Sequence, residues 1–440
     1  MKTLSSEQSP AAFRIQAKIY LNIILPLFLT SIIAYLDRQN LSYAKLTMNA
    51  DMDFSDEMYG FGAGIFFLGY ILFEVPGALI AERFSPKWWI ARIMISWGFL
   101  TLLLAFIQNA WQFYLLRFLI GAAEASLYPV IYASVIPRWF VKSDRARAIS
   151  ILLTSLQLSA IIGGPIAGTL IDIEIGSLHG WQSLFVLESF PAMLLGPIIA
   201  YWMADRPSTA RWLSQEEKDL LERSLSSDIA QAAEPKQYSL RQAFRDTEVL
   251  KLCLIYFLWL TAFWGFNNWL PTLLKSMSGL SNTLVGWLTV IPMTMSLLFM
   301  LWIGHSSSIT GEKRWHGAVG LFLATLGMTL GTFTDNKWLA FACLCITAIG
   351  IYSPMGVWWS YPTTFLSGAA AAGAIGLINS CGNFGGFVGT YLMGIFKQWT
   401  GSSEGGSRIL ALFMLVAALL MLTCKKQVSD KTPENAGKLP

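Results

Sequence analysis

Apolar segments of about twenty residues recur along nearly the whole of this 440-residue chain, separated by short polar loops. A helix needs roughly 20 residues, at a rise of about 1.5 Å each, to cross the hydrocarbon core of a bilayer, and its backbone polar groups must be satisfied within the segment. Twelve segments have about this length; they lie near residues 18–40, 58–81, 88–108, 111–136, 147–171, 181–203, 251–274, 283–304, 316–333, 337–359, 369–397 and 408–424. The sequence therefore predicts an all-α membrane protein with twelve transmembrane helices.

The composition excludes several classes of function. Charged residues make up 13% of the chain and hydrophobic residues 54%, whereas a soluble chain carries about 25% charged residues. The formal net charge of +4 is spread over many loops, so we expect no nucleic-acid partner. The five cysteines and three histidines show no metal-ligand spacing, and no catalytic cluster or phosphate-binding loop is present. We therefore expect no cofactor, no metal and no enzymatic activity.

A polar stretch divides the twelve segments into two sets of six. Within it, Ser214 is followed three residues later by Glu217, the pattern of a capping box at the start of an amphipathic helix. The predicted regions are a cytoplasmic tail (1–17), an N-terminal six-helix bundle (18–203), a cytoplasmic linker (204–250), a C-terminal six-helix bundle (251–424) and a second cytoplasmic tail (425–440). The first apolar segment is too long for a signal peptide, so we expect it to remain as span 1.

Lysine and arginine concentrate in alternate loops. They occur before span 1, after spans 2, 4 and 8, and in the C-terminal tail, whereas the loop after span 1 is acidic. Because cytoplasmic loops carry the excess of these residues, both termini are predicted to lie in the cytoplasm.

Glycine and proline occupy matching positions in the two sets. Span 4 has Gly121 followed by Pro129, and span 10 has Gly350 followed by Pro354. Small residues let helices approach closely, and proline permits bending where neighbouring groups satisfy the freed carbonyls. The match favours an internal repeat of the kind that transporters contain.

Ionisable side chains at membrane depth are concentrated in the first set of spans. Such a side chain costs at least ~2.5–3.5 kcal/mol on insertion scales, so it normally faces a cavity and has a partner. Arg117 and Glu124 are seven residues apart in span 4, which places them on one helix face, about 10 Å apart along the axis. An arginine there can hold a carboxylate through two parallel hydrogen bonds. Glu124 can exchange a proton, because lost hydration favours its neutral form and nearby cations favour its charged form. The alternative is a static ion pair that holds helices together.

Span 1 contributes a second charged pair, Asp37 and Arg38. Adjacent residues point about 100° apart on a helix, so the two side chains are expected to meet different surroundings. The alternative is that both lie just outside the apolar zone. For Glu74, Arg92 and Glu188 a structural role is expected, because each lies toward a span end or beside a proline.

The second set of spans carries no ionisable residue at depth and offers amides instead. Asn379 and Asn383 in span 11, together with Gln157 in span 5, are candidates for hydrogen bonds to a polar solute. The alternative for each is a hydrogen bond to a neighbouring helix.

Several longer motifs carry a family resemblance. They are YLDRQNLSYAKLTMN (35–49), GYILFEVPGALIAERFSPKWWIARI (69–93), RFLIGAAEASLYPV (117–130), GWQSLFVLE (180–188), ADRPSTARWLSQEEK (204–218) and GNFGGFVGTYLMG (382–394). Over nearly its whole length the chain resembles the major facilitator superfamily and, within it, the anion:cation symporter family of organic-anion transporters. The resemblance implies the major facilitator fold, proton-coupled uptake and alternating access around a central site.

The resemblance also assigns roles to residues. It implies that Asp37 and Glu124 take part in proton coupling and that Arg38 or Arg117 attracts the substrate anion. The superfamily's loop motif after span 2 matches Glu82, Arg83 and Lys87, with Ser85 replacing its glycine. The equivalent loop of the second set has Ser308 and Ile309 where Asp-Arg is usual, and Thr390 replaces a proline common in span 11.

The predicted function is therefore a proton-coupled symporter. We expect a monomer in the lipid bilayer of the cell inner membrane that imports a small organic anion: a sugar acid, a hydroxy-dicarboxylate or an aromatic acid. Arg38 and Arg117 would bind the carboxylate, with Gln157, Asn379 and Asn383 contacting other polar groups. The alternative is a facilitator or exporter of a neutral or cationic solute.

Overall fold

The computed structural model describes residues 10–231, 245–359, 361 and 368–425. Parts of the predicted tails and of the predicted linker fall outside these residues. Within the described residues the chain is helical, and its one β-type contact is an isolated bridge between Ile175 and Leu178.

The first set of spans is built from six helical stretches. Their elements are α1 (Pro10–Ile19), η1 (Tyr20–Ile24), α2 (Leu25–Asp51), α3 (Asp56–Arg83), α4 (Pro86–Leu104), α5 (Ala110–Glu124), α6 (Leu127–Pro129), η2 (Val130–Val135), α7 (Ile136–Trp139), α8 (Lys142–Leu170) and α9 (Gly180–Trp202). Span 1 runs through α1, η1 and α2, and span 4 runs through α5, α6, η2 and α7.

The second set follows a short connecting region. Its elements, with those of the connection, are η3 (Pro207–Thr209), α10 (Gln215–Gln231), α12 (Thr247–Ser278), α13 (Asn282–Thr310), α14 (Arg314–Gly331), α15 (Lys337–Tyr352), α16 (Met355–Trp358), α17 (Gly368–Thr400) and α18 (Glu404–Thr423). Among the described residues ten spans are both long and apolar enough to cross a membrane. With α14 and α17 they form the twelve predicted helices, in two bundles of six.

Local sequence signals set many of the helix ends. The side chains of Ser55, Asn109 and Ser281 accept hydrogen bonds from backbone N–H groups of the helices that follow them, which satisfies donors that a helix start leaves unpaired. Gly279 and Gly311 end α12 and α13 with φ of +70° and +69°, a conformation that glycine adopts without a steric penalty.

Span 4 is interrupted directly after Glu124. Helix α5 ends at that residue, and a π-helical stretch, η2, follows Pro129. Proline has no N–H to donate and its ring crowds the preceding turn, so the regular helical pattern breaks there. Span 10 is interrupted at the matching position, between α15 and α16 at Pro354.

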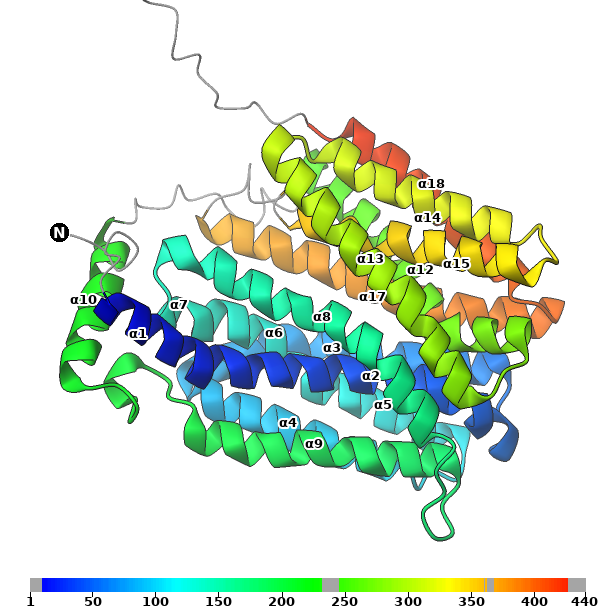
Figure 1. Ribbon diagram of the computed structural model, residues 1–440, viewed down its shortest axis with the longest axis horizontal. Coiled ribbons are helices and arrows are strands. Elements are labelled where there is room, and N and C mark those ends of the chain that lie inside the picture. Colours follow the sequence, from blue (N-terminus) through cyan, green and yellow to red (C-terminus); the bar gives the residue numbers. More distant parts are fainter. Residues whose placement is uncertain (1–9, 232–244, 360, 362–367, 426–440) are drawn as a thin grey trace, which may run out of the picture.

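Among the described residues, the two halves contact each other most extensively along the helix pairs α3 with α17, α8 with α13, and α2 with α12. Figure 1 shows α10 beside α1 at one end of the bundles, which we name the linker end; the other is the far end. Toward the far end, α8 and α13 approach closely at glycines. A Cβ on Gly164 would lie 2.6 Å from the carbonyl oxygen of Gly286, so only residues without a side chain allow this contact.

Polar groups also join the two halves at the far end. The Tyr43 hydroxyl donates to Thr289 Oγ1 at 3.1 Å. Asp172, just after α8, accepts hydrogen bonds from Asn282 and Thr283 at the start of α13, both at 2.8 Å. The far end is therefore closed by contacts that must break if the halves separate there.

Candidate functional site

An ion pair between two helices of the first half forms the centre of the site. Nη2 of Arg38 on α2 lies 2.6 Å from Oε1 of Glu124 at the end of α5. Arg38 is 9% exposed and Glu124 is 0% exposed, so neither charge is compensated by bulk water and each depends on the other. The sequence left open which arginine Glu124 would meet, and the structure gives Arg38 rather than its own-helix neighbour Arg117.

Asp37 points away from this pair, as the 100° separation predicts. Its carboxylate accepts a hydrogen bond of 3.1 Å from Thr101 Oγ1 on α4. Asp37 and Arg117 are also buried, at 7% and 4% exposed, and they interact electrostatically. The site therefore contains two acids and two arginines, and both members of the span 1 pair are buried within the protein.

Aromatic rings enclose the Arg38 guanidinium. Its Cζ lies 5.2–5.9 Å from the ring centroids of Tyr35, Phe66, Tyr70 and Tyr128. Arg117 lies 4.9 Å from the same Phe66 ring. Ring faces stabilise a guanidinium without using its N–H donors. Phe66 and Tyr70 are one helical turn apart on α3, a spacing that was available in the sequence but is also common in ordinary packing.

Both arginines keep unused hydrogen-bond donors. Nε of Arg38 and Nε of Arg117 are buried and make no hydrogen bond with the described residues. Buried polar groups are normally satisfied, so unpaired donors at one place mark a site that can receive an acceptor. A carboxylate supplies acceptor oxygens with the geometry that arginine prefers.

The predicted amides lie on both sides of the contact between the halves. Gln157 on α8 is fully buried; its Nε2 lies 3.7 Å from Met300 Sδ and its Oε1 accepts from Ser296 at 3.5 Å, both on α13. Asn379 on α17 donates to Oε1 of Glu74 on α3 at 2.8 Å. Nδ2 of Asn383, one turn further along α17, is buried and has no partner among the described residues.

The loop motif after span 2 lies at the linker end, away from this cluster. Glu82 and Arg83 are exposed and Lys87 is half-buried. Ser85, which stands where the motif has glycine, donates to Asp205 Oδ2 at 2.5 Å, and the Lys87 N–H donates to Asp205 Oδ1 at 3.0 Å. Asp205 thus anchors the loop to the chain that follows α9, a contact the sequence did not indicate.

Thr390 also has a defined role in packing. Its Oγ1 accepts a hydrogen bond of 2.9 Å from Asn268 Nδ2, and its carbonyl accepts one of 3.4 Å from the Trp269 indole N–H. These bonds join α12 to α17. Proline at this position would provide neither the hydroxyl nor its own backbone N–H.

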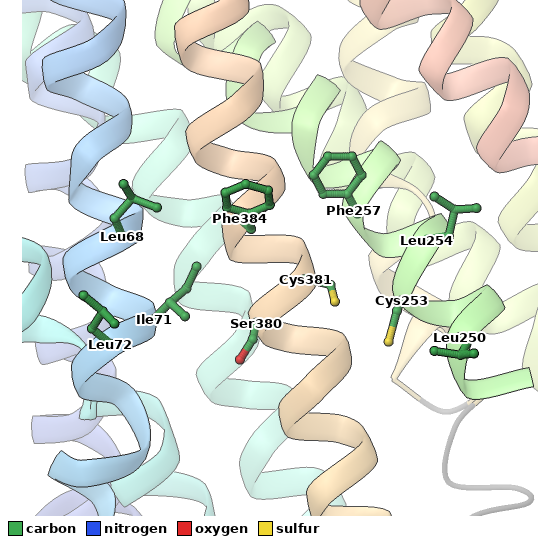
Figure 2. A pocket seen from close by; sticks show the side chains of 10 residues that line it. All are labelled: Leu68, Ile71, Leu72, Leu250, Cys253, Leu254, Phe257, Ser380, Cys381 and Phe384. Carbon is green, nitrogen blue, oxygen red and sulfur yellow. The ribbon is translucent and has the colours of Figure 1, made fainter. Parts of the chain in front are cut away.

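An apolar hollow of about 670 Å³ lies between α3, α12 and α17 (Figure 2), outside the charged cluster. Its lining has no charged residue; it consists of Leu68, Ile71, Leu72, Leu250, Cys253, Leu254, Phe257, Ser380, Cys381 and Phe384. Such a surface fits hydrocarbon rather than an anion. On α17, Ser380 and Phe384 are each one residue past Asn379 and Asn383, so the amides point about 100° away from this hollow.

The fold and the buried charged cluster define a polytopic membrane transporter rather than an enzyme. The chain belongs to the Major Facilitator Superfamily, whose sequence pattern matches residues 27–390.

Known relatives agree with this family. The chain is 39% identical over 431 residues to a transporter from Agrobacterium vitis whose name proposes tartrate as its substrate, with 97% of each chain covered. It is 36% identical to a quinolone resistance transporter from Acinetobacter baumannii, covering 90% of this chain and 92% of the relative. In fold it is similar to a D-xylose–proton symporter, with a TM-score of 0.75, 15% identity, and 94% and 99% of the two chains covered.

Proposed function

We propose that this transporter is a proton-coupled symporter that imports a small organic anion. In this proposal both termini and α10 lie in the cytoplasm of a bacterial cell, and the far end faces the periplasm. The observation that carries the proposal is the buried Arg38–Glu124 pair, with unused arginine donors on both Arg38 and Arg117.

The pair offers a physical route to coupling. Arg38 balances the charge of Glu124 while the site is empty. An arriving carboxylate competes for the guanidinium, so Glu124 loses part of its compensation and the free energy of binding a proton becomes more favourable. Because linkage is reciprocal, proton binding by Glu124 also strengthens anion binding.

Asp37 and Arg117 form a second acid–base pair beside the first. Asp37 accepts a hydrogen bond from Thr101, and its interaction with Arg117 weakens if Arg117 engages the anion. Asp37 is therefore the second proposed proton site, and Arg117 the second contact for the substrate.

The proposed substrate class is supported by the positive charge of the buried arginines and by the names of the relatives. Two buried arginines favour a carboxylate over a neutral or cationic solute. The relative named for tartrate supports a hydroxy-dicarboxylate, and sugar acids and aromatic acids are the other proposed classes. The quinolone resistance relative supports a second candidate function, the export of a drug-like compound.

Transport by purified protein in proteoliposomes tests the proposal. With an acidic exterior, labelled tartrate, a sugar acid or an aromatic acid should accumulate inside, and a protonophore should abolish the accumulation. The control is a quinolone under the same gradient. Quinolone transport without accumulation of any of the three test acids would reject the symporter and support the exporter.

A further inference from the structure

Glu74 and Asn379 form a hydrogen bond between the two halves of the transporter. Nδ2 of Asn379 on α17 donates to Oε1 of Glu74 on α3 at 2.8 Å. Glu74 is buried and Asn379 is half-buried. A structural role was expected for Glu74 and a substrate contact for Asn379, and the bond links the two residues.

This bond sets which atom of the amide is left for another partner. In this hydrogen bond Oε1 of Glu74 is the acceptor and the amide NH₂ is the donor, and an asparagine amide has one end that donates and one that accepts. Rotating the amide by 180° would bring Oδ1 against the Glu74 oxygen, and two acceptors repel. Glu74 therefore holds the Nδ2 end, and Oδ1 of Asn379, which has no hydrogen bond with the described residues, remains as a free acceptor.

Asn383 supplies the complementary group. It lies one turn along the same face of α17, and its buried Nδ2 has no partner among the described residues. A free acceptor and a free donor thus lie one helical turn apart on α17, and together they match a hydroxyl group, because a hydroxyl both donates and accepts.

The two amides lie close to the charged cluster. Glu74 interacts electrostatically with Arg38. On α3 it is one turn from Tyr70, whose ring packs against the Arg38 guanidinium. Glu74, and with it Asn379, therefore lies on the α17 side of a carboxylate that meets Arg38.

We propose that Glu74 is a positioning residue that orients Asn379 to accept a hydrogen bond from a substrate hydroxyl, so that the transporter selects hydroxy acids. This inference rests on the proposed organic-anion function and narrows its substrate class. A keto acid would place a carbonyl oxygen against Asn379 Oδ1, and an unsubstituted acid would leave both amides unpaired. One lost hydrogen bond in a buried site reduces affinity by roughly tenfold to a hundredfold.

Three matched four-carbon acids test the proposal: L-malate has a hydroxyl, oxaloacetate a ketone and succinate neither. Binding to the purified full-length protein is measured from the ligand-dependent rise in Tm, which does not require transport. The wild type should bind L-malate at least about tenfold more tightly than either other acid. Equal affinity for L-malate and succinate would overturn the proposal and leave organic-anion transport intact. No binding of any of the three acids would overturn the selection of four-carbon hydroxy acids, and the organic-anion function would then be decided by the proteoliposome assay with the sugar acid and the aromatic acid.

Two variants separate positioning from a structural role. In Glu74→Leu the amide is free to rotate and present its NH₂ group, so the preference for L-malate over oxaloacetate should fall by roughly tenfold. Asn379→Ala should weaken the binding of L-malate alone, so that its affinity comes within about threefold of the affinity for succinate. Equal losses for all three acids in both variants would overturn the proposal, because a purely structural residue does not distinguish the ligands.

Glu57→Leu is the matched control. Glu57 also joins α3 to α17, since its Oε1 accepts a hydrogen bond of 3.1 Å from the Tyr391 hydroxyl. It lies seventeen residues before Glu74, or about 25 Å along the helix. Its variant should keep the wild-type order of the three acids, and a change of order there would overturn the assignment to Glu74.

Discussion

Asp56 and Lys397 join the two halves of the transporter at the far end. Oδ2 of Asp56, the first residue of α3, lies 3.3 Å from Nζ of Lys397 near the end of α17. Oδ1 of Asp56 lies 2.9 Å from Nζ of Lys45 on α2, and that ammonium lies 3.0 Å from the centroid of the Trp269 ring on α12. Two of these contacts, with Lys397 and Trp269, cross between the halves and must break when the far end opens.

Lys397→Gln should therefore favour opening at the far end. The pair is partly exposed, so its loss is worth at most ~1 kcal/mol, or about a fivefold change in the opening equilibrium. Maleimide labelling of Thr289→Cys, a buried position between the halves, measures the opening in a background whose five native cysteines are replaced by alanine. Arg408→Gln, which breaks an ion pair within α18, is the control and should label at the parent rate. Unchanged labelling in Lys397→Gln would show that the ion pair does not hold the far end closed.

The connecting helix provides a prediction about pH. Burial raises the pKa of Glu217, but hydrogen bonds from Lys18 and from the Ser214 backbone N–H outweigh it and hold that pKa below its usual range. A lowered pKa in the folded state means that the contribution to stability is complete above the usual value of about 4.3 and is lost as the pH falls through the folded-state value. Glu217→Gln should expose α10 to proteolysis at pH 7, and the wild type should approach the variant only below about pH 4. Equal proteolysis of both proteins at pH 7 would contradict this role.

The same helix shows what the sequence predicted well. The Ser214–Glu217 capping box is confirmed, with the Ser214 N–H 2.8 Å from Glu217 Oε2 and the Glu217 N–H 3.2 Å from Ser214 Oγ. A helix cap depends on residues three apart, and a transmembrane span depends on about twenty consecutive residues. Both can therefore be predicted from a short stretch of sequence. The contact of Glu217 with Lys18, 2.7 Å long, joins residues almost two hundred positions apart, and no local pattern indicates it.

The candidate site likewise has features that the local sequence predicts and features that depend on how the helices pack. Burial of Asp37, Arg38, Arg117 and Glu124 could be predicted, because charges in apolar segments need shelter and partners. The pairing of Glu124 with Arg38 instead of Arg117 could not, because it depends on how α2 and α5 are rotated against each other. The bond from Asn379 to Glu74 also requires the relative placement of the two halves, which no spacing within either half determines.

Arg38→Lys should impair transport strongly although it keeps the charge. The ammonium can still pair with Glu124, but it lacks the planar surface that packs among four aromatic rings. It also cannot form the two parallel hydrogen bonds that a guanidinium makes with a carboxylate. We expect a fall in kcat/KM of at least about tenfold, measured as initial uptake into proteoliposomes. Arg92→Lys is the matched control, since Arg92 also stacks on an aromatic ring, 4.2 Å from the Trp89 centroid, and is expected to have a structural role. Normal uptake by Arg38→Lys would show that its planar contacts are not needed.

The last prediction concerns how Glu124 couples the proton to the anion. Glu124→Gln imitates the protonated side chain: it keeps a polar group near Arg38 but cannot gain or lose a proton. Substrate should therefore still bind and still exchange between compartments. During exchange the carrier crosses the membrane in both directions with substrate bound, so the protonation state of residue 124 does not need to change. Accumulation driven by a pH gradient should fall well below the wild-type level, because the variant no longer carries the proton that Glu124 supplies and only Asp37 remains as a proton site. One preparation assayed in two ways separates this role from a static ion pair: counterflow at equal pH should remain near the wild-type rate, whereas accumulation under the gradient should fall. A residue that only holds α2 against α5 would, when changed, reduce both activities together and lower Tm. Accumulation at the wild-type level in Glu124→Gln would remove Glu124 from the coupling mechanism and leave Asp37 as the proposed proton site.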